Sequence, residues 1–439
     1  MGRSRPLRPL LCLCALLLAA TAASVQSTRA DDAEKIVDPV ILEQAWQGAK
    51  TMFYDPTYRG VDWDSVLDRY RARAKDAVTQ RELHGVVTDM LGELKASHTE
   101  LITPKYMQRF LIDGPKRIGV PQFGMTLTRL KEGFFVSRIL PGSSSDAGGV
   151  RRGDRLVSIN GRPPNPAQLL GVPYESGLGG PRSYLIPCEK TTQVKVEFER
   201  TPTPLGRYRV KLQAHGWNET AAGLYSQRVI KRDGLRLGYV RIYHLLGYDP
   251  VFMTHEFIRT HPRLDGMIVD LRGRGGAPEA AAKLISYFDR SRVAPPAPPG
   301  SSPNQTRRAR RAPSGAYFSK PCVALMDHGT RSVKELIAFE WRRRRIGALV
   351  GQRTRGAFLG VEFPGGLRRL SDNSFLMVPS IDMRPVAGGV DIEGEGIEPD
   401  VYVEDELRYA NGRDPILDAG ANTLRLAILA SKRRKGAWH

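Results

Sequence analysis

Short apolar runs alternate with an amphipathic segment between residues 321 and 360. The runs 322–326 and 346–350 are apolar enough to be buried strands, and turn residues follow the first of them. Ser332 and Glu335 then have the spacing of a helix capping box, and apolar positions with helical spacing follow. The pattern predicts a strand, turn, helix and strand, with Ser332 at the carboxyl end of the first strand, where open α/β sheets place their sites.

A similar pattern precedes this unit. Residues 236–242 and 267–271 are predicted strands, and the second is apolar enough to be buried on both faces of a parallel sheet. Helices are expected after them, at 252–260 and, beyond a glycine-rich turn, at 278–288. Strands that alternate with crossover helices predict an α/β core.

The pattern changes before residue 235. Asp62 and Thr79 begin two segments in which apolar residues have helical spacing. Between residues 118 and 159, short apolar runs alternate with turn sequences, which is typical of a small β-rich unit. We therefore expect a helical segment, a β-rich domain and an α/β core, in this order.

The first 30 residues differ in composition from the rest. Three arginines precede a short apolar stretch, and small residues typical of a cleavage site follow. This order predicts a secretory signal peptide over residues 1–30 and a periplasmic or secreted protein without a stable membrane span; an uncleaved anchor is the alternative. Cys188 and Cys322 would then remain; their spacing predicts no metal site and leaves a disulfide between them open.

The formal charge of +20 raises the hypothesis of nucleic acid binding. Loss of the signal peptide would lower it by four, to +16. The arginines are mostly scattered, and the two dense runs lie at a predicted helix end and in a proline-rich loop at 293–315. Because no nucleic-acid motif occurs, we expect no nucleic-acid partner.

Ser332 has two interpretations from its position alone. It can be a helix N-cap, with its hydroxyl bonded to a backbone N–H. It can also be a nucleophile, whose developing oxyanion would meet backbone N–H groups at the same helix start. The spacing does not decide between them.

Residues 329–356 resemble the catalytic segment of the S41 serine peptidases, the group of carboxyl-terminal processing proteases, tricorn protease cores and retinoid-binding relatives. The family's G-T-x-S-x-x-E turn stands here at 329–335, and its G-E-x-T-x-G strand end at 351–356 with Gln352 for the glutamate. The resemblance implies that Ser332 is the nucleophile. Processing proteases place a general-base lysine directly after this strand end, whereas this chain has Ala357 there.

The resemblance extends to the N-terminal helical segment, where the family has a D-W-D start, matched at 62–64, and then an L-x-x-x-H-T motif, matched by Leu94 and His98-Thr99. Without the lysine, Ser332 would need a base whose pKa is nearer neutrality, and imidazole is the usual choice. The tricorn-like branch implies a tetrad in which His98 is the base and the serine before it and a distant glutamate orient it. These positions fall on Ser97 and Glu393, with Glu395 and Glu398 as nearby alternatives to the glutamate.

The glycine-rich turn at 270–276 resembles the family's D-L-R-x-N-G-G, with Arg274 in place of the asparagine. The resemblance implies that the N–H of Gly275, or less favourably Gly276, pairs with the N–H of Val333 as the oxyanion donors. From the residues alone, the glycines fit equally well a tight strand-to-helix turn. The spacing matches neither a dinucleotide fingerprint nor a P-loop.

Residues 118–161 closely resemble a bacterial PDZ domain, through F-G-M, F-F-V-S-R-I-L-P-G-S and G-G-V-R-R-G-D-R-L-V-S-I-N-G. In such domains a peptide carboxyl terminus adds a strand, and loop N–H groups hold its carboxylate. The resemblance implies that Phe123 and Gly124 bind substrate in this way. A PDZ domain that only packs and binds no peptide is the alternative.

Together these resemblances imply an α/β multi-domain protein with a ClpP/crotonase-like catalytic core and an inserted PDZ domain. The expected boundaries are a helical segment at 31–112, the PDZ domain at 113–202, a connector at 203–234, the core at 235–432 and a basic tail at 433–439. The implied function is a secreted serine endopeptidase acting on unfolded or C-terminally presented polypeptides, without metal or organic cofactor. The alternatives are a catalytically decayed peptide-binding protein and a lipophilic-ligand carrier of the same fold.

Overall fold

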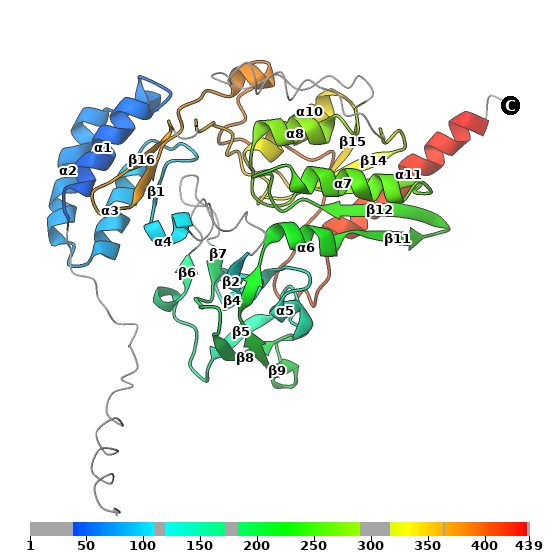
Figure 1. The fold of residues 1–439 in the computed structure, drawn as a ribbon, viewed down its shortest axis with the longest axis horizontal. Coiled ribbons are helices and arrows are strands. Elements are labelled where there is room, and N and C mark those ends of the chain that lie inside the picture. The colour runs from blue at the N-terminus through cyan, green and yellow to red at the C-terminus, as the bar shows by residue number, and fades with distance from the viewer. Residues whose placement is uncertain (1–37, 109–118, 172–182, 290–316, 363–364, 437–439) are drawn as a thin grey trace, which may run out of the picture.

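The computed structural model describes residues 38–108, 119–171, 183–289, 317–362 and 365–436. Figure 1 shows an N-terminal group of helices, a β-rich unit and an α/β unit arranged around a common centre. The signal peptide expected at 1–30 and the arginine-rich loop expected at 293–315 lie outside the described residues.

The α/β unit is built on a six-stranded sheet. Its order is β11 (Arg228–Arg232), β12 (Leu235–Arg241), β13 (Gly266–Asp270), β14 (Cys322–Met326), β15 (Gly347–Gly351) and β18 (Val401–Tyr402). The edge strand β11 is antiparallel to β12, and the other pairs are parallel. The α/β core predicted from alternating strands and helices is thus confirmed, as is the crossover from β14 to β15.

Helices cover both faces of this sheet. One face carries α7 (Asp249–Thr260), α8 (Pro278–Ile285) and α10 (Val333–Arg343), and the other carries α11 (Pro415–Gly436). Strand residues alternate between the faces: Met267 and Val269 pack with α8 and α10, whereas Ile268 packs with α11. Because both faces are covered, β13 and β14 are buried at every position, and they are apolar except for Asp270 at the end of β13.

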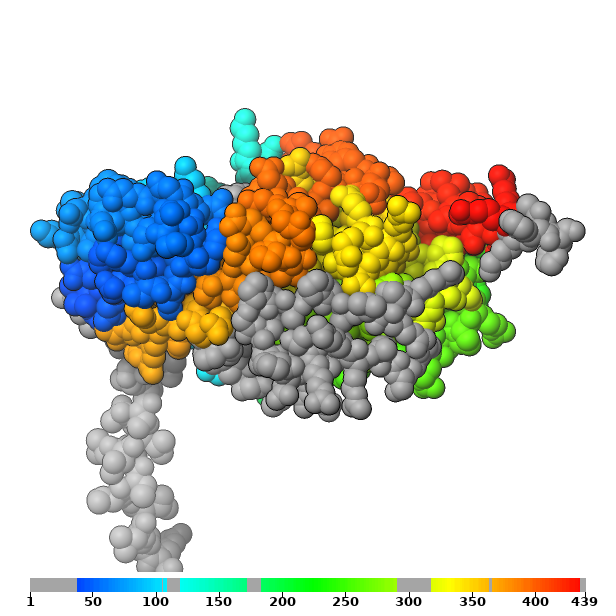
Figure 2. Space-filling view, turned by 90° about the horizontal axis from the view of Figure 1, so that it is seen from above, coloured from blue at the N-terminus to red at the C-terminus, as the bar shows by residue number. Residues whose placement is uncertain are grey.

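The N-terminal helices share a core with residues of the segment 359–378. These helices are α1 (Ile41–Met52), α2 (Trp63–Asp76) and α3 (Gln80–Gly92), and Leu376 and Val378 are buried among them. Strand β1 (Glu100–Ile102) pairs with β17 (Phe375–Met377), which pairs with β16 (Leu367–Arg369). Figure 2 shows the segment after residue 360, in orange, between the blue helices and the yellow core. The chain just after His98 is therefore paired with the segment that follows β15.

The β-rich unit is a seven-stranded sheet. Its order is β6 (Leu170–Gly171), β7 (Ser183–Leu185), β3 (Met125–Leu130), β4 (Gly133–Ile139), β5 (Arg155–Ile159), β8 (Gln193–Glu199) and β9 (Arg207–Gln213). Residues 203–234, expected to be a connector, supply β9 to this sheet and β11 to the other. Val210 and Leu212 are two positions apart, so in a strand their side chains point to the same face. Both pack against the β-rich core, which explains why this segment joins the sheet as β9.

Smaller elements join the units. They are α4 (Pro104–Tyr106), α5 (Ser144–Ala147), α6 (Glu219–Ser226) and the antiparallel pair β2 (Val120–Gln122) with β10 (His215–Trp217). Cys188 and Cys322 are both buried, and in the described structure no disulfide joins them. Within the described ranges, no helix is both long and apolar enough to cross a membrane.

The β-rich unit is held against the segment before α11. Arg152 pairs with Asp405 at 2.7 Å, and the Tyr409 hydroxyl donates to Glu199 at 2.7 Å. The backbones meet closely at Gly153, where an added Cβ would lie 2.2 Å from the nitrogen of Ala410. These contacts fix one wall of the cleft described below.

Candidate active site

Ser332 lies on a strained turn between β14 and α10. Its backbone has φ of 58° and ψ of −132°, a conformation that is costly for a residue with a side chain. The turn is held because the Ser332 N–H donates to the carbonyl of Ala357 at 2.8 Å and to the Glu335 carboxylate at 3.1 Å. The surrounding structure thus holds Ser332 at the start of the helix, as its sequence position predicts.

Glu335 does more than cap this helix. Its fully buried carboxylate also accepts hydrogen bonds from the Thr354 hydroxyl at 2.6 Å and from the Gly356 N–H at 2.7 Å. Burial raises the pKa of Glu335 to about 7. The capping-box spacing predicted that Glu335 caps the helix. It did not predict the contacts of Glu335 with Thr354 and Gly356, because these depend on tertiary structure.

His98 lies between α3 and β1 and also has a positive φ, 58°. Its Nδ1 is 2.9 Å from the Ser97 hydroxyl oxygen, and that hydroxyl lies 2.9 Å from Oε2 of Glu393. An ionised carboxylate only accepts, so the Ser97 hydroxyl donates to Glu393 and accepts the Nδ1–H of His98. This tautomer leaves Nε2 of His98 able to take a proton.

Glu393 is the centre of this arrangement. Its carboxylate also accepts from the N–H groups of Ser97 at 2.6 Å, Phe358 at 2.8 Å and Leu359 at 3.0 Å. Burial raises the pKa of Glu393. The alternatives considered from sequence, Glu395 and Glu398, are exposed and pair with Arg353 instead. The geometry therefore brings Ser97, His98 and Glu393 together and leaves the other two glutamates outside.

One backbone segment connects this group to Ser332. Ala357 accepts from the Ser332 N–H, and the next two residues donate to Glu393. In the described part of the chain, no hydrogen bond joins the Ser332 hydroxyl to the His98 ring. The structure therefore links the two side chains through residues 357–359 and Glu393 and not by a direct hydrogen bond.

The His98 ring is electrostatically biased toward its neutral form. Burial and, secondarily, the positive charge of Arg331 lower the pKa of His98 to about 4. Arg331 directly precedes Ser332, so its effect on His98 also indicates that the two chain segments are close. A neutral imidazole at physiological pH can accept a proton from a hydroxyl.

The glycine-rich turn packs directly against Ser332. An added Cβ at Gly275 would lie 2.5 Å from Cβ and 2.8 Å from Oγ of Ser332, so this approach requires glycine. Among described residues, the N–H groups of Gly275 and Val333 have no hydrogen-bond acceptor. Gly276 pairs instead with Leu245, whose carbonyl carbon would be 2.1 Å from an added Cβ. Gly275 and Val333 can therefore receive an oxyanion at Ser332.

A cleft of about 660 Å³ opens beside this site. Its walls are formed by β3 and β4 of the β-rich unit, by the start of α6, and by turns that include Gly273, Arg274 and Arg331. The last two residues directly precede Gly275 and Ser332. Across the residues with described positions, no group of three His, Cys, Asp or Glu side chains is arranged to hold a metal ion.

Phe123 and Gly124 form the loop before β3. Phe123 is buried in the β-rich core, and its carbonyl accepts from the Ser145 N–H at 2.9 Å. The outer edge of β3, to which a peptide would add in a PDZ domain, is already paired with β7, Leu127 with Tyr184. The sequence did not predict this pair because β7 is only three residues long.

Family comparisons agree with these units. The profile described as "Peptidase family S41" matches residues 236–403, "Tricorn protease C1 domain" matches 39–92, and "PDZ domain" matches 112–169. The chain belongs to peptidase family S41. The C1 match covers α1 to α3, and the S41 match covers most of the sheet that carries Ser332.

Individual proteins that resemble most of this chain support the S41 assignment. A putative tricorn protease homolog 2 of Streptomyces coelicolor is 30% identical over 415 residues, which are 88% of this chain and 32% of that protein. A carboxyl-terminal-processing protease of Synechocystis is 23% identical over 375 residues, 84% of this chain and 81% of that protein. The S41 chain thus spans about a third of the length of the tricorn relatives that it matches.

Solved structures share the fold. Mature CPAF complexed with lactacystin has a TM-score of 0.52 at 15% identity, over 89% of this chain and 100% of that one. The photosystem II D1 C-terminal processing protease has a TM-score of 0.50 at 18% identity, over 87% of this chain and 99% of that one. At these identities the likeness supports the architecture of the S41 chain.

Glu393 connects Ser97 to Phe358 and Leu359, so its removal should strongly destabilise the folded protein. Glu393→Ala would leave buried N–H donors without an acceptor, and we expect the free energy of unfolding to fall by about 2–4 kcal/mol. Urea denaturation followed by circular dichroism measures the change. The exposed neighbour provides the control: Glu395→Ala should change stability by less than about 0.5 kcal/mol. Equal effects of the two substitutions would contradict the link.

Proposed function

We propose that this S41 chain is a secreted serine endopeptidase of the tricorn-like type. The observation that carries the proposal is the hydrogen-bonded series from His98 through Ser97 to Glu393, which is tied by residues 357–359 to the turn holding Ser332. With Ala357 at the position of the processing proteases' lysine, the imidazole is the base that the site offers.

In the proposed reaction, the Ser332 hydroxyl attacks the peptide carbonyl while its proton moves to Nε2 of His98. The Ser97 hydroxyl and the Glu393 carboxylate orient the ring through Nδ1 and stabilise its protonated form. The N–H groups of Gly275 and Val333 receive the developing oxyanion. His98 then returns the proton to the leaving amine, and water hydrolyses the acyl-enzyme by the same route.

The proposed substrates are unfolded or C-terminally presented polypeptides. The cleft beside Ser332 is lined partly by the PDZ unit, so a chain held there would pass the nucleophile. We also propose that a peptide carboxyl terminus binds at Phe123 and Gly124. The peptide would have to displace β7, which pairs with the same edge of β3. Secretion through the segment 1–30 remains a proposal from the sequence.

The central test is the loss of hydrolysis when the nucleophile is removed. Purified protein should release fluorescent fragments from a labelled unfolded polypeptide, and Ser332→Ala should lower the rate at least about 10³-fold. A fluorophosphonate should label the unsubstituted protein at Ser332. Cleavage that persists in the alanine variant would refute this assignment.

The low pKa of His98 predicts activity into the acid range. Because the neutral ring is the base, kcat/KM should fall only as the pH approaches about 4, below the ordinary histidine value of 6.5. Arg331→Gln removes a positive charge and should move this acid limb to higher pH, whereas the exposed Arg342→Gln should not. An acid limb near 6.5 that neither change moves would argue against His98 as the buried base.

The β3–β7 pair predicts a masked peptide site. Tyr184→Pro should break the short strand β7, because proline lacks the N–H that strand pairing uses. A labelled peptide with a free carboxyl terminus should then bind more tightly by fluorescence anisotropy than it binds the unsubstituted chain. Tyr184→Phe is the matched control and should bind like the unsubstituted chain. Equal affinity of all three proteins would contradict competition by β7.

A further inference from the structure

Lys334 is a buried amine that the proposed reaction does not use. It directly follows Val333 at the start of α10, and its side chain has no exposed surface. Its Nζ donates a hydrogen bond to the carbonyl of Ile242, just beyond the end of β12. A lysine at this depth is rare unless its amine has a specific task.

The Lys334 amine lies next to the glycine-rich turn. An added Cβ at Gly273 would lie 3.4 Å from Nζ of Lys334, which is ordinary contact distance. Gly273 has φ of 127°, a conformation that favours glycine. Two residues later the same turn reaches Gly275, which packs against Ser332. The amine therefore lies next to the turn that adjoins the nucleophile.

Charged groups on several neighbouring elements act on this amine. Asp270 at the end of β13, Glu219 at the start of α6 and Asp327 after β14 attract its positive charge, and Arg241 at the end of β12 opposes it. The charge of Lys334 also acts on His244. Burial is the largest influence and lowers the pKa of Lys334 to about 7, despite the three carboxylates.

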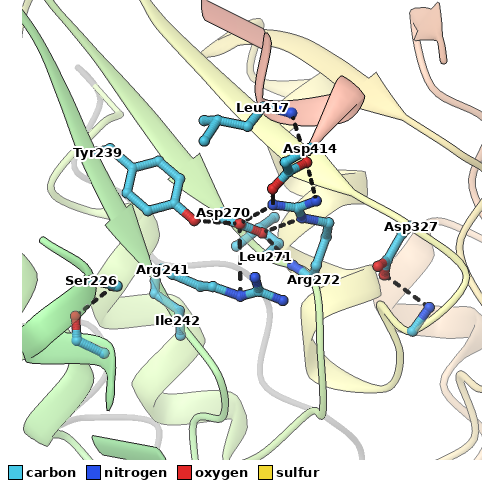
Figure 3. Close-up of polar contacts among 12 residues, drawn as sticks. Ser226, Tyr239, Arg241, Ile242, Asp270, Leu271, Arg272, Asp327, Asp414 and Leu417 are labelled. Carbon is cyan, nitrogen blue, oxygen red and sulfur yellow. Dashed lines mark hydrogen bonds and ion pairs between the residues drawn. The ribbon is translucent and has the colours of Figure 1, made fainter. Parts of the chain in front are cut away.

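A second anchor holds the same turn from the far side of the sheet. The Arg272 guanidinium donates to Asp270 at 2.6 and 2.9 Å and to both oxygens of Asp414 at 2.8 Å. Figure 3 shows Asp270 between Tyr239 and Arg272, with Arg241 at the end of the neighbouring strand β12 and Ile242 directly after it. The guanidinium thus anchors the turn through Asp270 and Asp414, and the Lys334 amine lies next to it.

We propose that Lys334 is a positioning residue for the oxyanion site: its ammonium, bonded to the Ile242 carbonyl next to Gly273, keeps the glycine-rich turn in place and puts a positive charge near the N–H groups of Gly275 and Val333. This inference rests on the proposed peptidase function. Lys334 does not contact substrate and acts through the two backbone donors. A positive charge fixed in a site that excludes water stabilises a developing oxyanion more than a neutral amine does.

Lys334→Met tests the charge, because methionine fills a similar buried volume without an amine. We expect kcat for a peptide substrate to fall about tenfold, with KM changed less than about twofold, because the lost interaction acts in the transition state. In the unsubstituted chain, kcat should also decline as the pH rises through about 7 and the amine loses its proton. The methionine variant should lack this decline. Lys283→Met, on α8, is the matched control and should keep both kcat and the decline.

A stability measurement tests the same amine without activity. An unfolded lysine keeps its proton to about pH 10.5, whereas the buried one loses it near 7, so the unsubstituted chain should gain stability relative to Lys334→Met as the pH rises between these values. A flat difference would overturn the inference. So would a methionine variant with unchanged kcat and the same basic decline. Absence of any Ser332-dependent hydrolysis in the unsubstituted chain would instead refute the proposed function, and this inference with it.

Discussion

The candidate site depends on one buried carboxylate. Glu393 accepts four hydrogen bonds, two from Ser97 and two from the backbone at Phe358 and Leu359. These donors come from the N-terminal unit and from the α/β unit, so this single group fixes how the two meet. Its contacts are reinforced by the β1–β17 pair, which attaches the chain just after His98. Without this link, the imidazole and the serine would belong to separate units.

The site contains strained backbone and buried ionisable groups, both of which destabilise the folded state. The packed core around the site provides the stability that offsets them. Ser332 and His98 both have positive φ, and Lys334, Glu335 and Glu393 are ionisable groups removed from water. A sheet covered on both faces supplies the rigid frame that holds these groups in place. Such concentration of strain and buried charge at one place is typical of a catalytic centre rather than of a packing core.

Local sequence patterns predicted the elements well. Apolar runs predicted β13 and β14, and the capping box predicted that α10 begins after Ser332. The residues gathered around Glu393 were expected through family resemblance, because their separation of almost 300 positions leaves no periodic signal. The β3–β7 pair, the contact of Glu335 with Thr354 and the place of Lys334 next to Gly273 were not predictable. Each depends on long-range packing, which neither spacing nor propensity encodes.

The most direct measurement is a crystal structure of the protein after reaction with a fluorophosphonate. Our account predicts a covalent bond from Ser332 Oγ to phosphorus, with the phosphoryl oxygen accepting from the N–H groups of Gly275 and Val333. It also predicts Nε2 of His98 within hydrogen-bond distance of that Oγ, and the Ser97 hydroxyl still bonded to Glu393. An adduct at Ser332 with the His98 ring turned away, or phosphorus bound to another residue, would contradict the account.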